Sequence, residues 1–261
     1  MRANVAALLA LALPEGLPCL DLAGRNATAA ASAAAQGWEQ LSSALAAGRF
    51  PGATGDVLAL AVPRATCSCQ LDRWDQYAVC KGAYERGAQA LSFGIKGYDE
   101  WARHVQHEHA RLVPKLYDCY DTRKPAGFDN EFFPTCVGGK AGQRGGRAFE
   151  TLRRLLPAGA NQSALVKLDI ESSEFEVLES MTPGDFSRIE SLNVEYHFYG
   201  CPDAARIERL RRVLHQVQEQ LVVVDSQLND YGRPCSGGAA ALLPKLVAVS
   251  YASPRVCGGP P

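Results

Sequence analysis

The sequence has almost no net charge, because its 27 lysine and arginine residues are balanced by 28 aspartate and glutamate residues in 261 positions. A chain without a positive field does not attract phosphate backbones or anionic lipid, so nucleic acid is not an expected partner. Hydrophobic residues make up 47% of the chain and charged residues 21%, which excludes both a disordered chain and a membrane-embedded bundle. The length fits one large domain, or one medium domain with an extension.

Several nucleotide and metal motifs are incomplete. Gly94 and Gly97 do not form a full G-x-G-x-x-G set, which disfavours NAD binding. The glycine-rich stretch 138–147 has no G-K-[ST] after a strand, and it is predicted to be a mobile surface loop that could cover an acceptor site. Three histidines in 104–109 lack the H-E-x-x-H spacing, so no metal is predicted. A metal-dependent hydrolase that uses these histidines together with Asp169 is kept as an alternative hypothesis.

The N-terminus is typical of a secretory signal. Arg2 precedes nine apolar positions, Val5–Leu13, which is too short to span a bilayer, and no later run reaches membrane-spanning length. We therefore predict a signal peptide at 1–22, an Ala/Gly-rich N-terminal extension at 23–66 and a functional domain at 67–257. If the N-terminus is not a signal, a buried helix and a cytoplasmic location are the alternative.

Cysteine usage also favours the secretory pathway. Nine cysteines are many for a cytosolic chain of this size, and cleavage beyond Cys19 leaves an even eight. The sequons Asn26-Ala27-Thr28 and Asn161-Gln162-Ser163 are typical of a glycoprotein of the Golgi lumen or a secreted one. Cys67-Ser68-Cys69 with Cys80 lacks the two-residue gap and the second pair of a zinc knuckle, so disulfides or buried thiols are predicted there.

From about residue 88, short apolar runs alternate with amphipathic stretches, which is typical of an α/β sheet. Expected strands are 89–93, 115–120, 164–171, 189–198, 221–225 and 245–251, and expected helices are 98–112, 148–156, 172–178 and 203–220. Ser173 and Glu176 are predicted to form a capping box. The last two strands lack a crossover helix between them, so they are expected to pair antiparallel.

Residues at the carboxyl ends of parallel strands are the ones that contact ligand. The pattern places there Gly94, Asp121, Asp169, Glu171, Glu195 and His197. Gly94 lets a backbone approach a ligand closely. Asp121 follows it by 27 residues, near the spacing at which nucleoside-binding folds place a ribose carboxylate. The alternative is an ordinary turn glycine and a solvent-facing acid.

Four segments together resemble one enzyme family. Residues 165–178, LVKLDIESSEFEVL, resemble the LKIDIEGSEWEVL block of FkbM-type S-adenosylmethionine-dependent methyltransferases, especially the branch with the animal methyltransferase-like proteins. Residues 91–95 with Asp99 resemble the SFGI…D first motif of that branch. Residues 149–152 resemble its TL helix, and 192–198 resemble its VEFH strand.

The resemblance covers roughly residues 67–252 and implies a class I methyltransferase fold. That fold is Rossmann-like, with a seven-strand, mostly parallel sheet, a final antiparallel strand and S-adenosylmethionine at the carboxyl edge. Gly94 would lie beneath the methionine portion, and Asp121 would hold the ribose. The cofactor-binding residues that the resemblance implies are Ser92, Phe93, Gly94, Asp99, Asp121 and Asp169.

The implied reaction is methyl transfer to a hydroxyl of a sugar, glycan or small metabolite. The candidate bases are Asp169, Glu171, Glu195 and His197, and the sequence leaves the choice among them open. Ser172 stands where the family has glycine, and it would cost ~1–2 kcal/mol if the turn needs a positive φ. A catalytically silent secreted binding module on the same fold is therefore the alternative.

Overall fold

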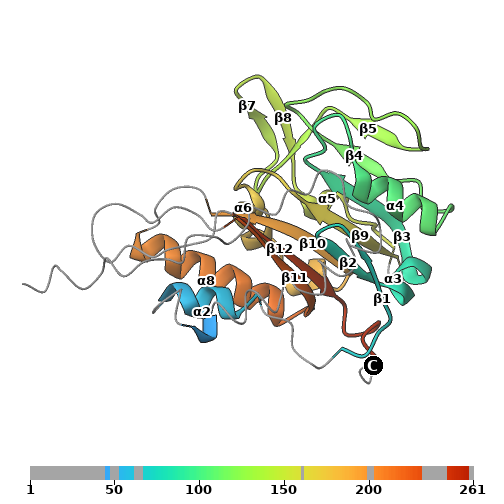
Figure 1. The fold of residues 1–261 in the computed structure, drawn as a ribbon. Coiled ribbons are helices and arrows are strands. Elements are labelled where there is room, and N and C mark those ends of the chain that lie inside the picture. The colour runs from blue at the N-terminus through green and yellow to red at the C-terminus, as the bar shows by residue number, and fades with distance from the viewer. Residues whose placement is uncertain are drawn as a thin grey trace, which may run out of the picture.

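The computed structural model describes residues 45–47, 53–61, 67–159, 162–198, 203–230 and 246–258. Its centre is a seven-stranded sheet with the order β11-β12-β10-β9-β3-β4-β5 (Figure 1). The strands are β3 (Gly87–Phe93), β4 (Lys115–Tyr117), β5 (Glu131–Phe133), β9 (Ser163–Leu168), β10 (Ile189–His197), β11 (Val222–Asp230) and β12 (Leu246–Ala252). The predicted α/β class and seven-stranded sheet are confirmed.

The sheet has one antiparallel strand and one point, beside β3, at which the strand order reverses. The neighbours β10, β9, β3, β4 and β5 are parallel, whereas β12 runs antiparallel between β10 and β11. The expected antiparallel pairing of the last two strands is thus confirmed. The chain runs outward from β3 through β4 to β5 and then returns to β9 on the other side of β3. In an open parallel sheet, a ligand crevice lies at the carboxyl ends beside such a reversal.

Helices cover both faces of the sheet. One face packs against α2 (Ala53–Ala59), α5 (Leu152–Leu155), α6 (Glu174–Glu179), α7 (Pro183–Phe186) and α8 (Ala204–Gln218). The other packs against α3 (Lys81–Arg86) and α4 (Glu100–Glu108). Side chains alternate across a strand, so Leu165 lies in one core cluster and Val166 in the other. The apolar side chains at helical spacing in α8 are buried, and they are Ile207, Leu210, Val213, Leu214 and Val217.

Short strands outside this sheet were not predicted. β1 (Leu71–Trp74) and β2 (Tyr77–Cys80) form an antiparallel hairpin. β6 (Cys136–Val137), β7 (Gly142–Arg144) and β8 (Arg147–Glu150) form a three-stranded sheet. The glycine-rich stretch predicted as a loop therefore forms part of a β-hairpin, although its residues 140–147 are exposed. Figure 1 shows this hairpin beside β4 and β5.

The sequence prediction fails at several element boundaries. The predicted helix 148–156 is wrong in its first half, because Phe149 pairs with β6 and β7 and only Leu152–Leu155 is helical. The helix predicted at 98–112 spans Glu100–Glu108, and the strand predicted at 115–120 ends at Tyr117. The predicted capping box is also wrong, since Ser173 makes no side-chain cap bond.

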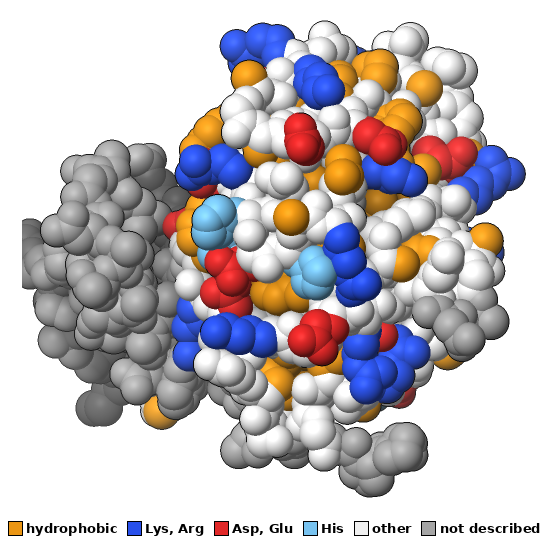
Figure 2. Space-filling view, turned by 90° about the vertical axis from the view of Figure 1, so that its right-hand side faces the viewer, with side chains coloured by type: hydrophobic (Ala, Val, Ile, Leu, Met, Phe, Trp, Pro, Cys, Tyr) orange, Lys and Arg blue, Asp and Glu red, His pale blue; other side chains and the backbone are white. Residues whose placement is uncertain are grey.

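Six cysteines form the disulfides Cys67–Cys257, Cys69–Cys80 and Cys119–Cys136, which confirms the expected disulfide chemistry for these six. The other three cysteines, the asparagines of both sequons, the predicted signal peptide and most of the predicted extension lie outside the described residues. Among the described helices, none combines the length and apolar character needed to cross a bilayer. Basic and acidic side chains are interspersed on the face that Figure 2 shows.

Candidate active site

Gly94 lies where the ends of β3 and β9 touch. Its φ is +79°, and a Cβ at this position would lie 1.6 Å from the carbonyl oxygen of Asp169. The Gly94 N–H donates to the Tyr117 carbonyl (3.1 Å), and the Asp169 N–H donates to the Phe93 carbonyl (3.2 Å). Only glycine combines this φ with such a close approach. Residue 94 is therefore fixed as glycine by the joining of three strand ends.

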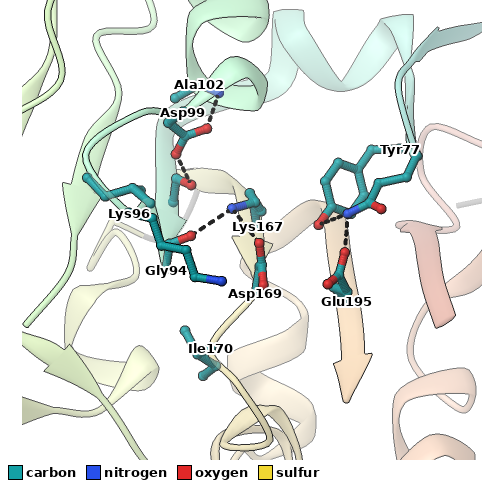
Figure 3. A network of polar contacts seen from close by, with 12 residues as sticks. Tyr77, Gly94, Lys96, Asp99, Ala102, Lys167, Asp169, Ile170 and Glu195 are labelled. Carbon is teal, nitrogen blue, oxygen red and sulfur yellow. Dashed lines mark hydrogen bonds and ion pairs between the residues drawn. The ribbon is translucent and has the colours of Figure 1, made fainter. Parts of the chain in front are cut away.

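Ser92, Phe93 and Asp99 are buried within the protein near this turn. The Ser92 hydroxyl donates to Asp99 Oδ2 at 2.5 Å, and Asp99 Oδ1 accepts the Ala102 N–H at 2.8 Å. Asp99 is thus the N-cap of α4, as Figure 3 shows. The Phe93 ring stacks on Tyr117 with ring centroids 4.9 Å apart. These three side chains bind other protein groups and hold the Gly94 turn and the start of α4 in place.

Two acids follow β4 and have different surroundings. Asp118, which the sequence did not single out, is buried and accepts four backbone N–H groups, those of Ile95, Lys96, Tyr120 and Asp121. Asp121 lies three residues further on, and a Cβ at Gly97 would be 3.1 Å from its Oδ2. Asp118 therefore fixes the loop, and Asp121 presents its carboxylate beside the turn that follows β3.

Asp121 is partly exposed and pairs with Arg123. The Arg123 Nε donates to Asp121 Oδ1 at 2.9 Å, and the Arg123 backbone N–H donates to the same atom at 3.0 Å. These hydrogen bonds from Arg123 lower the pKa of Asp121 to about 2. Its carboxylate is therefore ionised at neutral pH and able to accept hydrogen bonds from a ligand.

Lys167, which is buried, and Asp169, which is partly exposed, form an ion pair at the end of β9. The Lys167 Nζ donates to the Gly94 carbonyl at 3.1 Å and lies 3.3 Å from Asp169 Oδ2 (Figure 3). Burial lowers the pKa of Lys167, but the carboxylates of Asp99 and Asp169 outweigh burial and leave the pKa raised. Burial raises the pKa of Asp169, which Lys167 only partly offsets. Asp169 is therefore a stronger base than an exposed aspartate.

His197, at the end of β10, lies between two glutamates and its side chain is only 2% exposed. Its Nδ1 is 2.8 Å from Glu174 Oε1, and its Nε2 is 3.2 Å from Glu195 Oε1. Burial lowers the pKa of His197, but hydrogen bonds to both glutamates raise it to about 10. At neutral pH both ring nitrogens carry protons, so this side chain holds two carboxylates in place and does not accept a proton.

Glu195 is also held from a second side. The Gln76 side-chain amide, at the tip of the β1–β2 hairpin, donates to Glu195 Oε2 and, at 3.0 Å, to the Tyr77 hydroxyl. Burial raises the pKa of Glu195, but the hydrogen bonds from His197 and Gln76 lower it below its ordinary value. The Glu195 carboxylate is consequently a weaker base than the Asp169 carboxylate.

The turn after β9 has a backbone that favours glycine. Glu171 has φ 55° and Ser172 has φ 80°. The Ser172 hydroxyl donates to the His197 carbonyl at 3.3 Å, and Glu171 Oε1 is 2.5 Å from Lys96 Nζ. Glu171 Oε2 lies 3.7 Å from His197 Nε2. The positive φ that Ser172 was expected to need is present, and the turn brings Glu171 to the same edge.

Among the described residues, two groups around histidine have ligand atoms close enough to hold an ion. In the first, Asp169, Glu195 and His197 have ligand atoms within 4.8 Å of one another, but a protonated His197 and the Lys167 ammonium already neutralise these carboxylates. In the second, His104 Nε2 binds Asp72 Oδ2 at 2.7 Å and stacks on Trp74. His104 is therefore part of a side-chain network with the β1–β2 hairpin.

The strand ends thus bring most predicted site residues together. Gly94, Asp169, Glu171, Glu195 and His197 are joined by direct contacts, and Asp121 lies beside Gly97 on the turn after β3. Sequence reasoning missed four polar residues that shape this edge, which are Gln76, Asp118, Lys167 and Glu174. The sequence offered two signals for them, which were Lys167 inside an otherwise apolar strand and Asp118 directly after a strand.

No protein-family model and no curated protein matches the chain. One similar solved structure is the mitomycin 7-O-methyltransferase MmcR, with 13% identity, a TM-score of 0.30, and coverage of 66% of this chain and 51% of that one. Another is the D21A mutant of the 16S rRNA (adenine(1408)-N(1))-methyltransferase from Catenulisporales acidiphilia, with 13% identity, a TM-score of 0.32, and coverage of 66% and 90%. The chain thus spans about half the length of MmcR. These likenesses are too remote to carry an argument, so the FkbM-type resemblance stays a prediction.

Proposed function

We propose that this protein is an S-adenosylmethionine-dependent methyltransferase that methylates a hydroxyl of a sugar, glycan or small metabolite. The observation that carries the proposal is the meeting of β3, β4 and β9 at one edge, beside the reversal of strand order. The Gly94 turn, which the joined strand ends fix, would lie beneath the methionine portion, and the ionised Asp121 would accept hydrogen bonds from the ribose hydroxyls. The FkbM-type resemblance over residues 165–178 agrees with this assignment.

Methyl transfer is an in-line displacement at a sulfonium carbon, so the protein aligns an acceptor oxygen and removes its proton. Among the candidate bases, Asp169 has the raised pKa, and its side chain is 22% exposed at the edge. Glu195 has a lowered pKa, and His197 is already protonated. We therefore assign Asp169 as the base, with Lys167 and His197 as positioning residues. The cofactor supplies the methyl group.

The test is binding of S-adenosylmethionine by calorimetry to the wild-type chain and to Asp121→Ala. Loss of charge-assisted hydrogen bonds to the ribose, about 1.5–3 kcal/mol, is expected to weaken binding about 10- to 100-fold. Asp129→Ala removes an exposed acid from the same connection and is the matched control. Because Asp121 is at the surface, neither variant should lose stability by more than about 0.5 kcal/mol. Unchanged affinity in Asp121→Ala would refute the ribose assignment.

A second candidate function is a catalytically silent binding module. The observation that favours it is Ser172, which occupies a positive-φ position where the family has glycine. Calorimetry with the cofactor and its demethylated product separates the two candidates, because a silent module with its disulfides formed is expected to bind neither. Transfer of a labelled methyl group to fractionated glycans and metabolites would favour the enzyme.

We also propose that the protein acts in the secretory pathway, either in the Golgi lumen or after secretion. The three disulfides among the described residues support an oxidising compartment. Fractionation of cells that express the full chain tests this, and recovery only from the cytosol would contradict it.

A further inference from the structure

Four cysteine sulfur atoms lie together at the base of the β1–β2 hairpin. Besides its own disulfide to Cys257, the Cys67 Sγ lies 3.5 Å from the Sγ of Cys69 and 3.9 Å from that of Cys80. The Sγ atoms of Cys67, Cys80 and Cys257 all lie within 4.8 Å of one another. The third disulfide, Cys119–Cys136, has no such neighbour among the described residues.

We propose that Cys67, Cys69, Cys80 and Cys257 form a tetrathiolate site for Zn²⁺ when the chain is reduced. A Zn–S bond of about 2.3 Å places the sulfur atoms of a tetrahedral site about 3.8 Å apart. Two of the four separations between the disulfides, those from Cys67 to Cys69 and to Cys80, are 3.5 and 3.9 Å and already have this value, and Cys80 and Cys257 lie within 4.8 Å of each other. The Cys69 sulfur has to move closer to that of Cys257. Once both disulfides open, each bonded pair also has to separate to the same spacing, which rotation of the side chains allows.

The backbone around the four cysteines holds them independently of the disulfides. The N–H and the hydroxyl of Ser68 both donate to the Cys257 carbonyl at 3.3 Å, which joins residues 189 positions apart. Cys80 and Cys257 are buried, in a small apolar cluster with Val224 and Ala252. A dry apolar surrounding limits access of water to metal–thiolate bonds. The ligands are thus brought together before a metal binds.

The chemistry balances with a phosphine as the named reductant. Each disulfide takes two electrons from one phosphine, which becomes a phosphine oxide with oxygen from water, and two thiols form. Zn²⁺ then displaces four thiol protons to give a tetrathiolate of net charge −2. A small-molecule disulfide reverses the change: two equivalents accept the four electrons and become four thiols with protons from water, the two protein disulfides form again, and Zn²⁺ is released. The same four residues therefore close two disulfides in an oxidising compartment and bind one Zn²⁺ in a reducing one.

Both the disulfide state and the zinc-bound state fix the β1–β2 hairpin, which reaches the candidate active site. Cys69 precedes β1, and Cys80 ends β2. The turn of this hairpin carries Gln76, whose amide donates to Glu195. The four sulfur atoms thus anchor the base of a hairpin whose tip holds a site carboxylate. A reduced chain without metal loses this anchor.

The first experiment uses the unmodified full-length chain, reduced with a phosphine and alkylated with or without one equivalent of Zn²⁺. Mass spectrometry reads each cysteine separately. Zn²⁺ is expected to slow alkylation of the four proposed ligands at least about tenfold and to leave the rates at Cys119 and Cys136 unchanged. Equal rates at the four cysteines with and without Zn²⁺, or protection confined to other cysteines, would overturn the proposal.

The second experiment replaces Zn²⁺ with Co²⁺, whose visible spectrum reports tetrahedral thiolate coordination. The reduced wild-type chain is expected to bind one Co²⁺ with this spectrum, and the double variant Cys80→Ser/Cys257→Ser to lose it. Cys119→Ser/Cys136→Ser removes the same number of sulfur atoms elsewhere and should keep it. The absence of a tetrathiolate spectrum in the wild type, or its survival in the first variant, counts against the site. Neither experiment involves S-adenosylmethionine, so its outcome is independent of the proposed function.

Discussion

Replacing Ser172 with glycine is expected to give a more stable protein than replacing it with alanine, by about 1 kcal/mol. A side chain at φ 80° costs ~1–2 kcal/mol, which alanine keeps and glycine removes. Both variants lose the 3.3 Å hydrogen bond to the His197 carbonyl, so its contribution cancels. Glycine costs ~0.4–1 kcal/mol more unfolded-state entropy, which leaves a difference near 1 kcal/mol. In a domain of this size, that corresponds to about 2–4 °C in Tm.

The assay is urea unfolding at neutral pH together with thermal melting of both variants. Ser180 is the matched site, because its hydroxyl also donates to a backbone carbonyl, that of Val177 at 2.7 Å, but its φ is −79°. At this site alanine is expected to be more stable than glycine, by about 0.5–1 kcal/mol. If Ser172→Ala proves as stable as Ser172→Gly, the turn carries no strain. The argument that losing the family glycine has an energetic cost would then be refuted.

The pKa of His197, raised from 6.5 to about 10 in the folded protein, predicts a pH dependence of stability. The stabilisation that the charged His197 side chain gives the folded protein is fully present below about pH 6.5 and is lost as pH rises through 10. Urea midpoints should therefore fall more steeply at alkaline pH in the wild type than in His197→Gln. Parallel profiles would mean that His197 is not charged in the fold. Gly94→Ala places a Cβ 1.6 Å from the Asp169 carbonyl and is expected to lose about 3 kcal/mol or more in urea unfolding. Gly127→Ala, which also has a positive φ but open space around it, should lose only about 1–2 kcal/mol, and equal losses would contradict the close contact.

The strands of the central sheet were largely predictable because their apolar runs are long and local. The short strands were not, since pairing with distant residues decides their structure. Residues 149–156 illustrate this: Phe149 and Leu152 have helical spacing, yet Phe149 lies opposite Cys136 in β6. The pattern of buried positions was correct, but the backbone hydrogen bonds came from another part of the chain.

The candidate site, like the fold, was predictable only in part. Strand ends could be located from the sequence, and the parallel order of the sheet brings them together. Their protonation could not be predicted, because it depends on partners far along the chain. The pKa of His197 is raised to about 10 by Glu174, 23 residues earlier, which lies against its Nδ1, and by Glu195 against its Nε2. Asp118 was missed for a similar reason, since its role depends on four N–H groups that converge after folding.

The charges at the site edge are consistent with a sulfonium cofactor. Among the side chains around His197 and Lys167 that the ion pairs above join, four carboxylates (Asp169, Glu171, Glu174 and Glu195) face three cations (Lys96, Lys167 and His197), so 4 − 3 leaves this group with one net negative charge when all are ionised. In the proposed reaction a bound sulfonium would bring one positive charge beside this group. Asp169 would take the acceptor proton as the cofactor gave up its methyl group and its positive charge. The summed charge of these residues and the cofactor would therefore stay the same through the reaction, and no charge would have to be buried or released at the step in which the methyl group moves.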